Sequence, residues 1–187
     1  MIRRLSVIIL VILMGAPLGF AREIGGVDLP ESLIAGKETL MLNGAGLRKK
    51  LFIKVYACGL YLKQKSREAP HIVSANEPMA IRMKFIYDGV SNEKLIDAWN
   101  EGFENGTSGN IAPIQAQVDE FNSFFVREAK KGDVYDIIYT PEAGVRVYIK
   151  DKLMGSIQGV EFKKALFAIW LGEKPADTSL RDGMLDK

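Results

Sequence analysis

The most distinctive pattern along the chain is the apolar stretch over residues 43–62, NGAGLRKKLFIKVYACGLYL. Residues 43–46 are typical of a turn, and the β-branched, aromatic and aliphatic residues that follow predict one long central strand. Successive side chains of a strand point to opposite faces, and over residues 51–62 both faces are apolar apart from Lys54. We therefore expect a sheet covered by helices on one face and by another element or a ligand on the other.

The remaining elements follow from the same periodicities. Ser91 is the expected N-cap of the first long helix, and a short helical turn is expected within residues 64–75. Apolar alternation predicts strands over residues 24–29, 37–42, 79–87, 134–139, 145–149 and 152–158. Apolar residues at helical spacing predict helices over residues 91–105, 113–131, 160–171 and 178–185.

The order of these elements predicts the fold class. Strands, then two helices, then strands and a helix do not alternate as in a parallel βαβ fold. The pattern indicates an α+β fold with an antiparallel sheet and helices packed on one face. No internal repeat or low-complexity linker interrupts the order, so residues 22–187 are expected to form a single domain.

The amino terminus has the pattern of a secretory signal peptide over residues 1–21. Arg3 and Arg4 precede an apolar run over residues 7–14, and small residues lead to Ala21. We expect cleavage after Ala21 and a periplasmic or secreted protein. The alternative is an uncleaved anchor, but a spanning helix needs about 20 apolar residues, and this run is interrupted after Met14; no membrane span is expected after cleavage.

Charge and composition exclude several function classes. Of 25 basic residues, Arg3 and Arg4 leave with the signal peptide, so residues 22–187 hold 23 basic and 23 acidic residues. This balance argues against a nucleic-acid binder, which needs excess positive charge. The chain has one cysteine, Cys58, and one histidine, His71, which disfavours internal disulfides, zinc sites and histidine-dependent hydrolases. No metal and no cofactor are expected.

Arg48 is the most informative candidate for a functional role, because it begins an otherwise apolar stretch. Tyr56 follows eight residues later. On one regular strand the two side chains would share a face but lie about 26 Å apart at about 3.3 Å per residue. They would meet only if residues 46–50 fold back, which glycine permits. The alternative is that Arg48 pairs with a surface carboxylate.

Three segments resemble the chalcone isomerase-like family, in its bacterial, secreted branch. They are NGAGLR with LFIKVYACGLYL, then MKFIYDGVSNEKLIDAWNEGF, and finally KALFAIWLGEKPADTSLRDGML. The resemblance covers nearly all of residues 22–187. It implies an open-faced β-sandwich, in which a large antiparallel sheet carries a layer of helices and a ligand cleft lies between them.

The plant enzymes of this family cyclise chalcones to flavanones with an arginine and a set of polar side chains. The resemblance places that arginine at Arg48 and a lysine at Lys94. The other polar positions are taken by Tyr56, Ser91 and Ala98, and, in a looser alignment, by Phe162. Most of the polar set is therefore missing, and loss of one oxyanion donor typically costs about 10² to 10³ in rate. Flavanone formation is not expected.

Non-catalytic members of the family bind fatty acids with an arginine and a tyrosine at the carboxylate, and Arg48 and Tyr56 fit that pattern. We therefore expect an exported, non-catalytic binder of a small amphipathic carboxylate such as a fatty acid. One alternative is an intramolecular lyase or isomerase that acts on an enone-like substrate, with Arg48 as electrophile and Lys94 as positioning cation. Another is an interaction module for an unknown protein partner. The expected apolar wall consists of Phe52, Leu60, Trp99 and Phe103.

Overall fold

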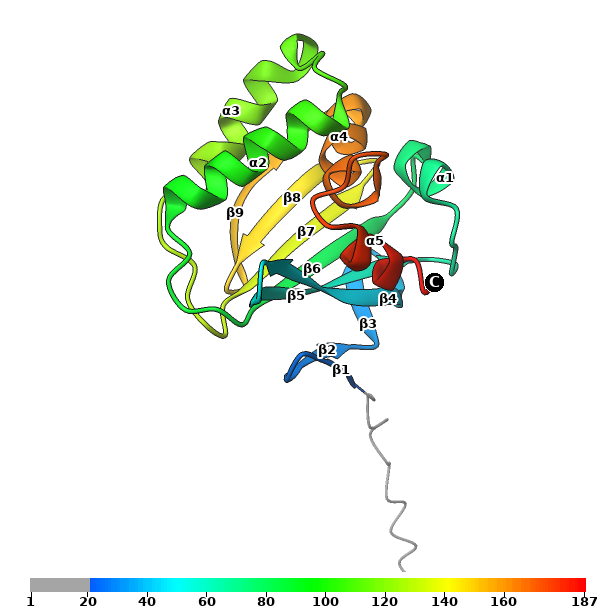
Figure 1. Cartoon of the computed structure of the whole chain (residues 1–187). Coiled ribbons are helices and arrows are strands. Elements are labelled where there is room, and N and C mark those ends of the chain that lie inside the picture. Colours follow the sequence, from blue (N-terminus) through cyan, green and yellow to red (C-terminus); the bar gives the residue numbers. More distant parts are fainter. Residues whose placement is uncertain (1–20) are drawn as a thin grey trace, which may run out of the picture.

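A seven-stranded antiparallel sheet organises the computed structural model, which describes residues 21–187 (Figure 1). Each strand pairs with its neighbours in sequence, in the order β3-β4-β5-β6-β7-β8-β9. The strands are β3 (Ser32–Ala35), β4 (Glu38–Lys50), β5 (Ile53–Leu62), β6 (Met79–Phe85), β7 (Val134–Thr140), β8 (Gly144–Ile149) and β9 (Lys152–Ile157). The signal peptide predicted over residues 1–21 lies outside the described residues, apart from Ala21.

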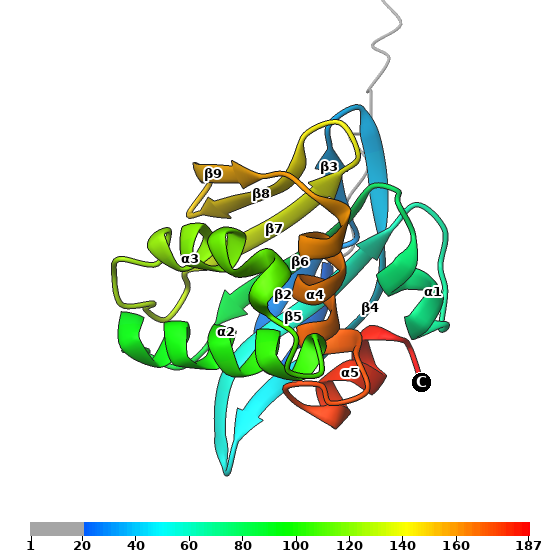
Figure 2. The ribbon, with the colours of Figure 1, turned by 90° about the horizontal axis from the view of Figure 1, so that it is seen from above.

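Helices cover one face of this sheet, as Figures 1 and 2 show. The main apolar core lies between the sheet and these helices. The helices are α1 (Ala69–Ser74), α2 (Asn92–Gly106), η1 (Ala112–Ile114), α3 (Gln115–Ser123), α4 (Val160–Leu171) and α5 (Thr178–Met184). The predicted α+β class, an antiparallel sheet under a layer of helices, is confirmed. In the described part of the chain no helix is long and apolar enough to cross a membrane.

The other face of the sheet carries a smaller apolar core. A two-stranded hairpin of β1 (Ala21–Ile24) and β2 (Val27–Pro30) contributes Leu29 to it. The sequence predicted a single strand over residues 24–29, whereas Gly25 and Gly26 form a turn in its middle with φ of +65° and +93°. Positive φ is readily adopted by glycine, so this pair reverses the chain there.

The turn predicted at residues 43–46 is wrong, whereas the long strand predicted after it is present as β5. The chain reverses instead at Leu51 and Phe52, between β4 and β5, and residues 43–46 lie inside β4. Packing explains the glycines. A Cβ at Gly44 would collide with the backbone oxygen of Gly183 in α5, and one at Gly46 would lie 3.0 Å from the backbone oxygen of Leu180. Glycine within a strand can mark such a close approach of another backbone.

The helix predicted over residues 113–131 is shorter than expected. It begins as η1 and α3 and ends at Ser123. The chain then returns along the sheet, where Val90 and Ala129 exchange backbone hydrogen bonds of 2.8 and 2.9 Å. Phe121, Phe125 and Ala129 are buried, so the apolar spacing identified core positions but not their backbone conformation.

Other predicted elements are confirmed within a few residues. Strands β6 to β9 and helices α2, α4 and α5 occupy the predicted segments. The hydroxyl of Ser91 caps α2 by accepting a hydrogen bond from the Lys94 backbone amide at 3.4 Å. Asp177 caps α5 in the same way, accepting from the Leu180 amide at 3.0 Å.

Lys163 of α4 is fully buried and ties α4 to the end of α1. Its ammonium donates to the backbone oxygens of Ile72, Val73 and Ala75 at 3.1, 2.9 and 2.6 Å. Burial is the main cause that lowers the pKa of Lys163 to about 8. The lysine therefore satisfies carbonyl groups that the helix leaves without a hydrogen bond. Burial disfavours its charged form.

This environment predicts a pH-dependent stability. The folded protein releases the Lys163 proton near pH 8, whereas the unfolded chain holds it up to 10.5. The free energy of unfolding of the wild type, relative to Lys163→Met, should therefore rise by about 1 kcal/mol per pH unit above pH 8. Urea unfolding of both proteins across this range measures the difference. A difference that does not change with pH would contradict the assignment.

Candidate functional site

The β4–β5 hairpin brings Arg48 and Tyr56 together. The two residues are direct partners across the antiparallel pair, so their side chains lie on the same face of the sheet. Tyr56 belongs to the main core, which identifies this face as the helix-covered one. The separation of about 26 Å expected for one regular strand does not apply, because the chain reverses between them at residues 51–52.

Tyr56 is buried and bonded to the helical layer. Its hydroxyl accepts a hydrogen bond from Nε1 of Trp170, on α4, at 3.2 Å. Burial is the main cause that raises the pKa of Tyr56, and the nearby Arg48 charge acts in the opposite direction. The phenol therefore stays protonated at neutral pH. Because its oxygen accepts from Trp170, its hydrogen is left to donate to another acceptor.

Arg48 lies at the edge of this region, with 29% of its side chain exposed. Its Nη1 is 3.5 Å from Oδ2 of Asp177 and donates to the backbone oxygen of Lys49 at 3.0 Å. The same Asp177 oxygen accepts from the Lys49 amide at 3.2 Å, and the other oxygen caps α5. A carboxylate of the protein itself therefore lies beside the guanidinium, as the surface-pair alternative predicted.

Aromatic rings fill the space between Tyr56 and the helices. The ring centroid of Trp99 lies 5.7 Å from that of Trp170, 5.6 Å from Phe121 and 5.4 Å from Phe125. Nε1 of Trp99 is buried and finds no hydrogen-bond partner among residues 21–187, which is costly in an apolar core. Leu60, Trp99 and Phe103 all belong to this core, so the structure places these three predicted wall residues with Tyr56.

Two predicted residues lie elsewhere. Phe52 is fully exposed at the turn of the hairpin and is not part of an apolar wall, because the turn interrupts the alternation that placed it with Tyr56. Lys94 lies on the exposed side of α2, as does Ala98, whereas Leu95 and Trp99 face the core. A lysine in that position does not serve as the positioning cation that the isomerase alternative requires.

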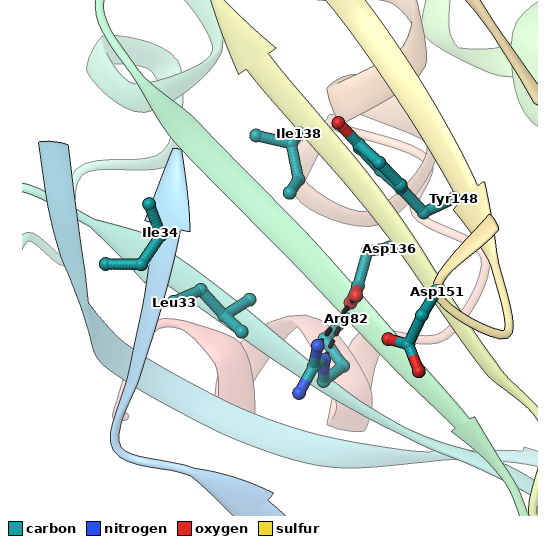
Figure 3. A pocket seen from close by; sticks show the side chains of 7 residues that line it. All are labelled: Leu33, Ile34, Arg82, Asp136, Ile138, Tyr148 and Asp151. Atoms are coloured by element: carbon teal, nitrogen blue, oxygen red, sulfur yellow. Dashed lines mark hydrogen bonds and ion pairs between the residues drawn. The ribbon is translucent and has the colours of Figure 1, made fainter. Parts of the chain in front are cut away.

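An open hollow lies on the opposite face of the sheet, against β3 (Figure 3). Arg82 and Asp136 meet there, with Nε and Nη2 of the arginine 2.7 Å from the two carboxylate oxygens. This bidentate pair neutralises both charges. The hollow is lined by Leu33, Ile34, Arg82, Asp136, Ile138, Tyr148 and Asp151. It contains neither Arg48 nor Tyr56.

Asp177 and Trp170 are the site residues that sequence reasoning missed. Asp177 was visible only as a residue ahead of the last helix, where an N-cap is expected. Trp170 belongs to the apolar stripe of the helix predicted over residues 160–171, which is α4 in the structure. Their proximity to residues 48 and 56 is a tertiary contact, which periodicity does not report. Within residues 21–187 no group of three His, Cys, Asp or Glu side chains is arranged to hold a metal ion.

Comparisons with known proteins agree with this architecture. The sequence model described as chalcone isomerase-like matches residues 21–186. Fatty-acid-binding protein 1 of Arabidopsis thaliana is 25% identical over 194 residues, covering 86% of this chain and 67% of the relative. A crystal structure of an Arabidopsis thaliana fatty-acid binding protein superimposes with a TM-score of 0.70 at 21% identity, covering 86% of this chain and 92% of the other. At that identity the structural likeness shows the fold alone.

Proposed function

The chain belongs to the chalcone isomerase-like family, and from this premise we propose that it is a non-catalytic binding protein for a fatty acid. The observation that carries the proposal is the pairing of Arg48 with Tyr56 across β4 and β5, on the helix-covered face. The guanidinium would bind the carboxylate of the ligand and the phenol would donate a hydrogen bond to it. The relative named as a fatty-acid-binding protein supports this choice of ligand.

The chemistry of the pair suits a carboxylate. A guanidinium offers two parallel donors that match the two carboxylate oxygens. The raised pKa of Tyr56 keeps the phenol a neutral donor. Because a ligand carboxylate would take the place of Asp177 beside Arg48, binding requires that the 3.5 Å ion pair between them opens. Such a partly exposed pair is worth only about 0.2–1 kcal/mol.

The acyl chain would pass into the apolar core behind Tyr56. That space is filled by the rings around Trp99 and Trp170, so the rings must rearrange when the chain enters. The unpaired indole Nε1 of Trp99 indicates that its present position is not optimal for hydrogen bonding. Entry of an acyl chain should therefore change the surroundings of both indoles.

Intrinsic fluorescence tests the proposal directly, because Trp99 and Trp170 are the only two tryptophans of the chain. Titration with a series of saturated fatty acids should change the emission in a saturable manner. A fatty alcohol of the same length should bind more weakly, since it lacks the carboxylate. If the fatty acids change nothing, and native mass spectrometry of protein purified from cells finds no lipid-sized ligand, the proposal fails.

Asp177→Asn should tighten fatty-acid binding by up to about fivefold. The substitution removes the charge that competes for Arg48 and keeps the oxygen that caps α5, since asparagine is as good an N-cap as aspartate. Asp182→Asn, an exposed residue of the same helix, is the matched control and should leave affinity unchanged. Equal or weaker binding by Asp177→Asn would show that Asp177 does not compete with the ligand.

Export is the second part of the proposal. The signal pattern over residues 1–21 supports it, and a cut after Ala21 would remove only the first residue of β1, which pairs with Pro30. Residues 22–24 would still pair with β2. The mass of the protein recovered from the exported fraction should correspond to a chain that begins at Arg22. A full-length mass, or retention of the protein in the cytoplasm, would contradict export.

A further inference from the structure

The turn of the β4–β5 hairpin exposes an unusual amount of apolar surface. Leu51 is 88% exposed, Phe52 100% and Ile53 46%. Figure 2 shows this hairpin, in cyan, reaching past the neighbouring elements to a narrow end. Isolated apolar side chains are common on protein surfaces, but three consecutive ones at a projecting tip are not.

The hairpin itself does not require these residues. Leu51 has a φ of +56°, a region that large side chains rarely adopt. Two-residue hairpin turns with positive φ at the first central position strongly favour glycine there. The chain therefore keeps two large apolar residues where turn geometry favours small ones and where no described residue buries them. Such a conflict between local sequence and fold is typical of a functional position.

Basic residues surround this apolar tip. Lys49, Lys50 and Lys54 are all exposed. No aspartate or glutamate occurs from Thr39 to Leu62. The acidic side chain bonded to this end of the hairpin is Asp177, which holds the Lys49 amide and Arg48 at its base. The tip thus combines an apolar end with a collar of positive charge.

We propose that the β4–β5 tip docks the protein on the surface of an anionic lipid bilayer. Leu51, Phe52 and Ile53 would enter the boundary between headgroups and acyl chains, and the three lysines would lie among the lipid phosphates. The tip is convex and projecting, which suits insertion into a fluid surface. Its charge complements the negative headgroups.

The tip lies next to the candidate carboxylate site. Lys49 pairs with Lys54, and the next pair inward is Arg48 with Tyr56. A molecule docked by the tip would therefore hold the candidate carboxylate site close to the bilayer surface. Docking does not depend on the proposed fatty-acid binding: it is measured with vesicles that contain no fatty acid, so either activity can be absent while the other is present.

Cosedimentation with vesicles tests the docking. The wild type should bind vesicles of equal parts phosphatidylglycerol and phosphatidylcholine, bind pure phosphatidylcholine much less, and lose binding as salt is raised. Leu51→Gly with Phe52→Asn supplies residues that favour the turn and should weaken binding at least about tenfold. Val126→Ser removes a 67% exposed apolar residue elsewhere and should have no effect.

The lysine collar has its own matched pair of variants. Substitution of Lys49, Lys50 and Lys54 by glutamine should weaken binding by about fivefold for each lysine. Substitution of Lys37, Lys63 and Lys65 removes the same charge at the opposite end of β4 and β5 and should change binding much less. Equal losses in the two triple variants would mean that net charge acts alone and would overturn the proposal.

A label at the tip provides a second readout that other parts of the chain do not affect. A nitroxide on Phe52→Cys should become accessible to oxygen and protected from a water-soluble quencher when anionic vesicles are added. The same label on Val126→Cys should stay in water, and Cys58 is buried. A label at residue 52 that stays in water would overturn the proposal. So would a dimer, seen by sedimentation velocity, that buries the tip and does not bind vesicles.

Discussion

Replacement of Arg48 by alanine should weaken fatty-acid binding at least about thirtyfold, since the ligand carboxylate would lose its hydrogen-bonded charge partner, a loss that costs about 2 kcal/mol or more. The guanidinium supplies the positive charge beside Tyr56, and alanine leaves the ligand carboxylate without its main partner. Fluorescence titration with a saturated fatty acid measures the loss. Stability should change by less than about 1 kcal/mol, because the pair with Asp177 is partly exposed.

Two variants make this result specific to Arg48. Arg48→Lys keeps the charge but not the two parallel donors, and should fall between wild type and alanine. Arg67→Ala removes an arginine whose side chain is 65% exposed and paired with Asp186, and it should bind as the wild type does. If Arg48→Ala binds fatty acid normally, another group holds the carboxylate.

Replacement of Arg82 by leucine should lower the free energy of unfolding by about 3 kcal/mol. Asp136 is 8% exposed and both of its oxygens bond to Arg82 at 2.7 Å. Leucine would leave that carboxylate buried without a partner. Urea unfolding measures the loss, and fatty-acid affinity should not change because this pair lies on the other face of the sheet.

The double variant Arg82→Leu with Asp136→Leu should recover much of that stability, since two apolar residues leave no buried charge unpaired. A double variant that loses the sum of the two single effects would show that the ion pair itself contributes the stability. Recovery would show that the loss of stability in Arg82→Leu comes from the buried Asp136 carboxylate that is left without a partner.

Regular elements of the fold could be predicted from the sequence because their signals are local. Alternation over residues 79–87 and the helical stripe after Ser91 each describe one element, and both are confirmed as β6 and α2. The order of the elements along the chain was enough to predict an antiparallel sheet. Residues 43–46 carry a turn signal and residues 51–52 carry none, so the sequence placed the turn in the glycine-rich segment, and that prediction was wrong.

The contacts of the site between residues far apart in the sequence could not be predicted from such local signals. The glycines of β4 are explained by the backbone of α5, which packs against them from the far end of the chain. Asp177 reaches Arg48 through that same contact. Arg48 and Tyr56 were identified from their residue types and from the family resemblance, while their pairing depends on a turn at Leu51 and Phe52 that lacks the usual turn residues.

The isomerase alternative receives no support from the geometry. Lys94 is on the exposed side of α2, and Ala98 lies on the same side. Phe162 is buried in the core. Arg48 is thus left with the Tyr56 phenol as its cross-strand neighbour and the Asp177 carboxylate 3.5 Å away, a set that suits binding of a carboxylate better than stabilisation of an enolate.

A crystal structure of the protein in complex with a saturated fatty acid, at full occupancy of the ligand, tests the central claim most directly. We expect the ligand carboxylate within hydrogen-bond distance of the Arg48 guanidinium and the Tyr56 hydroxyl. Asp177 should be displaced from Arg48, and the acyl chain should lie among the shifted rings of Trp99 and Trp170. A fatty acid bound in the hollow at Arg82 instead, with Asp177 still paired to Arg48, would contradict the account.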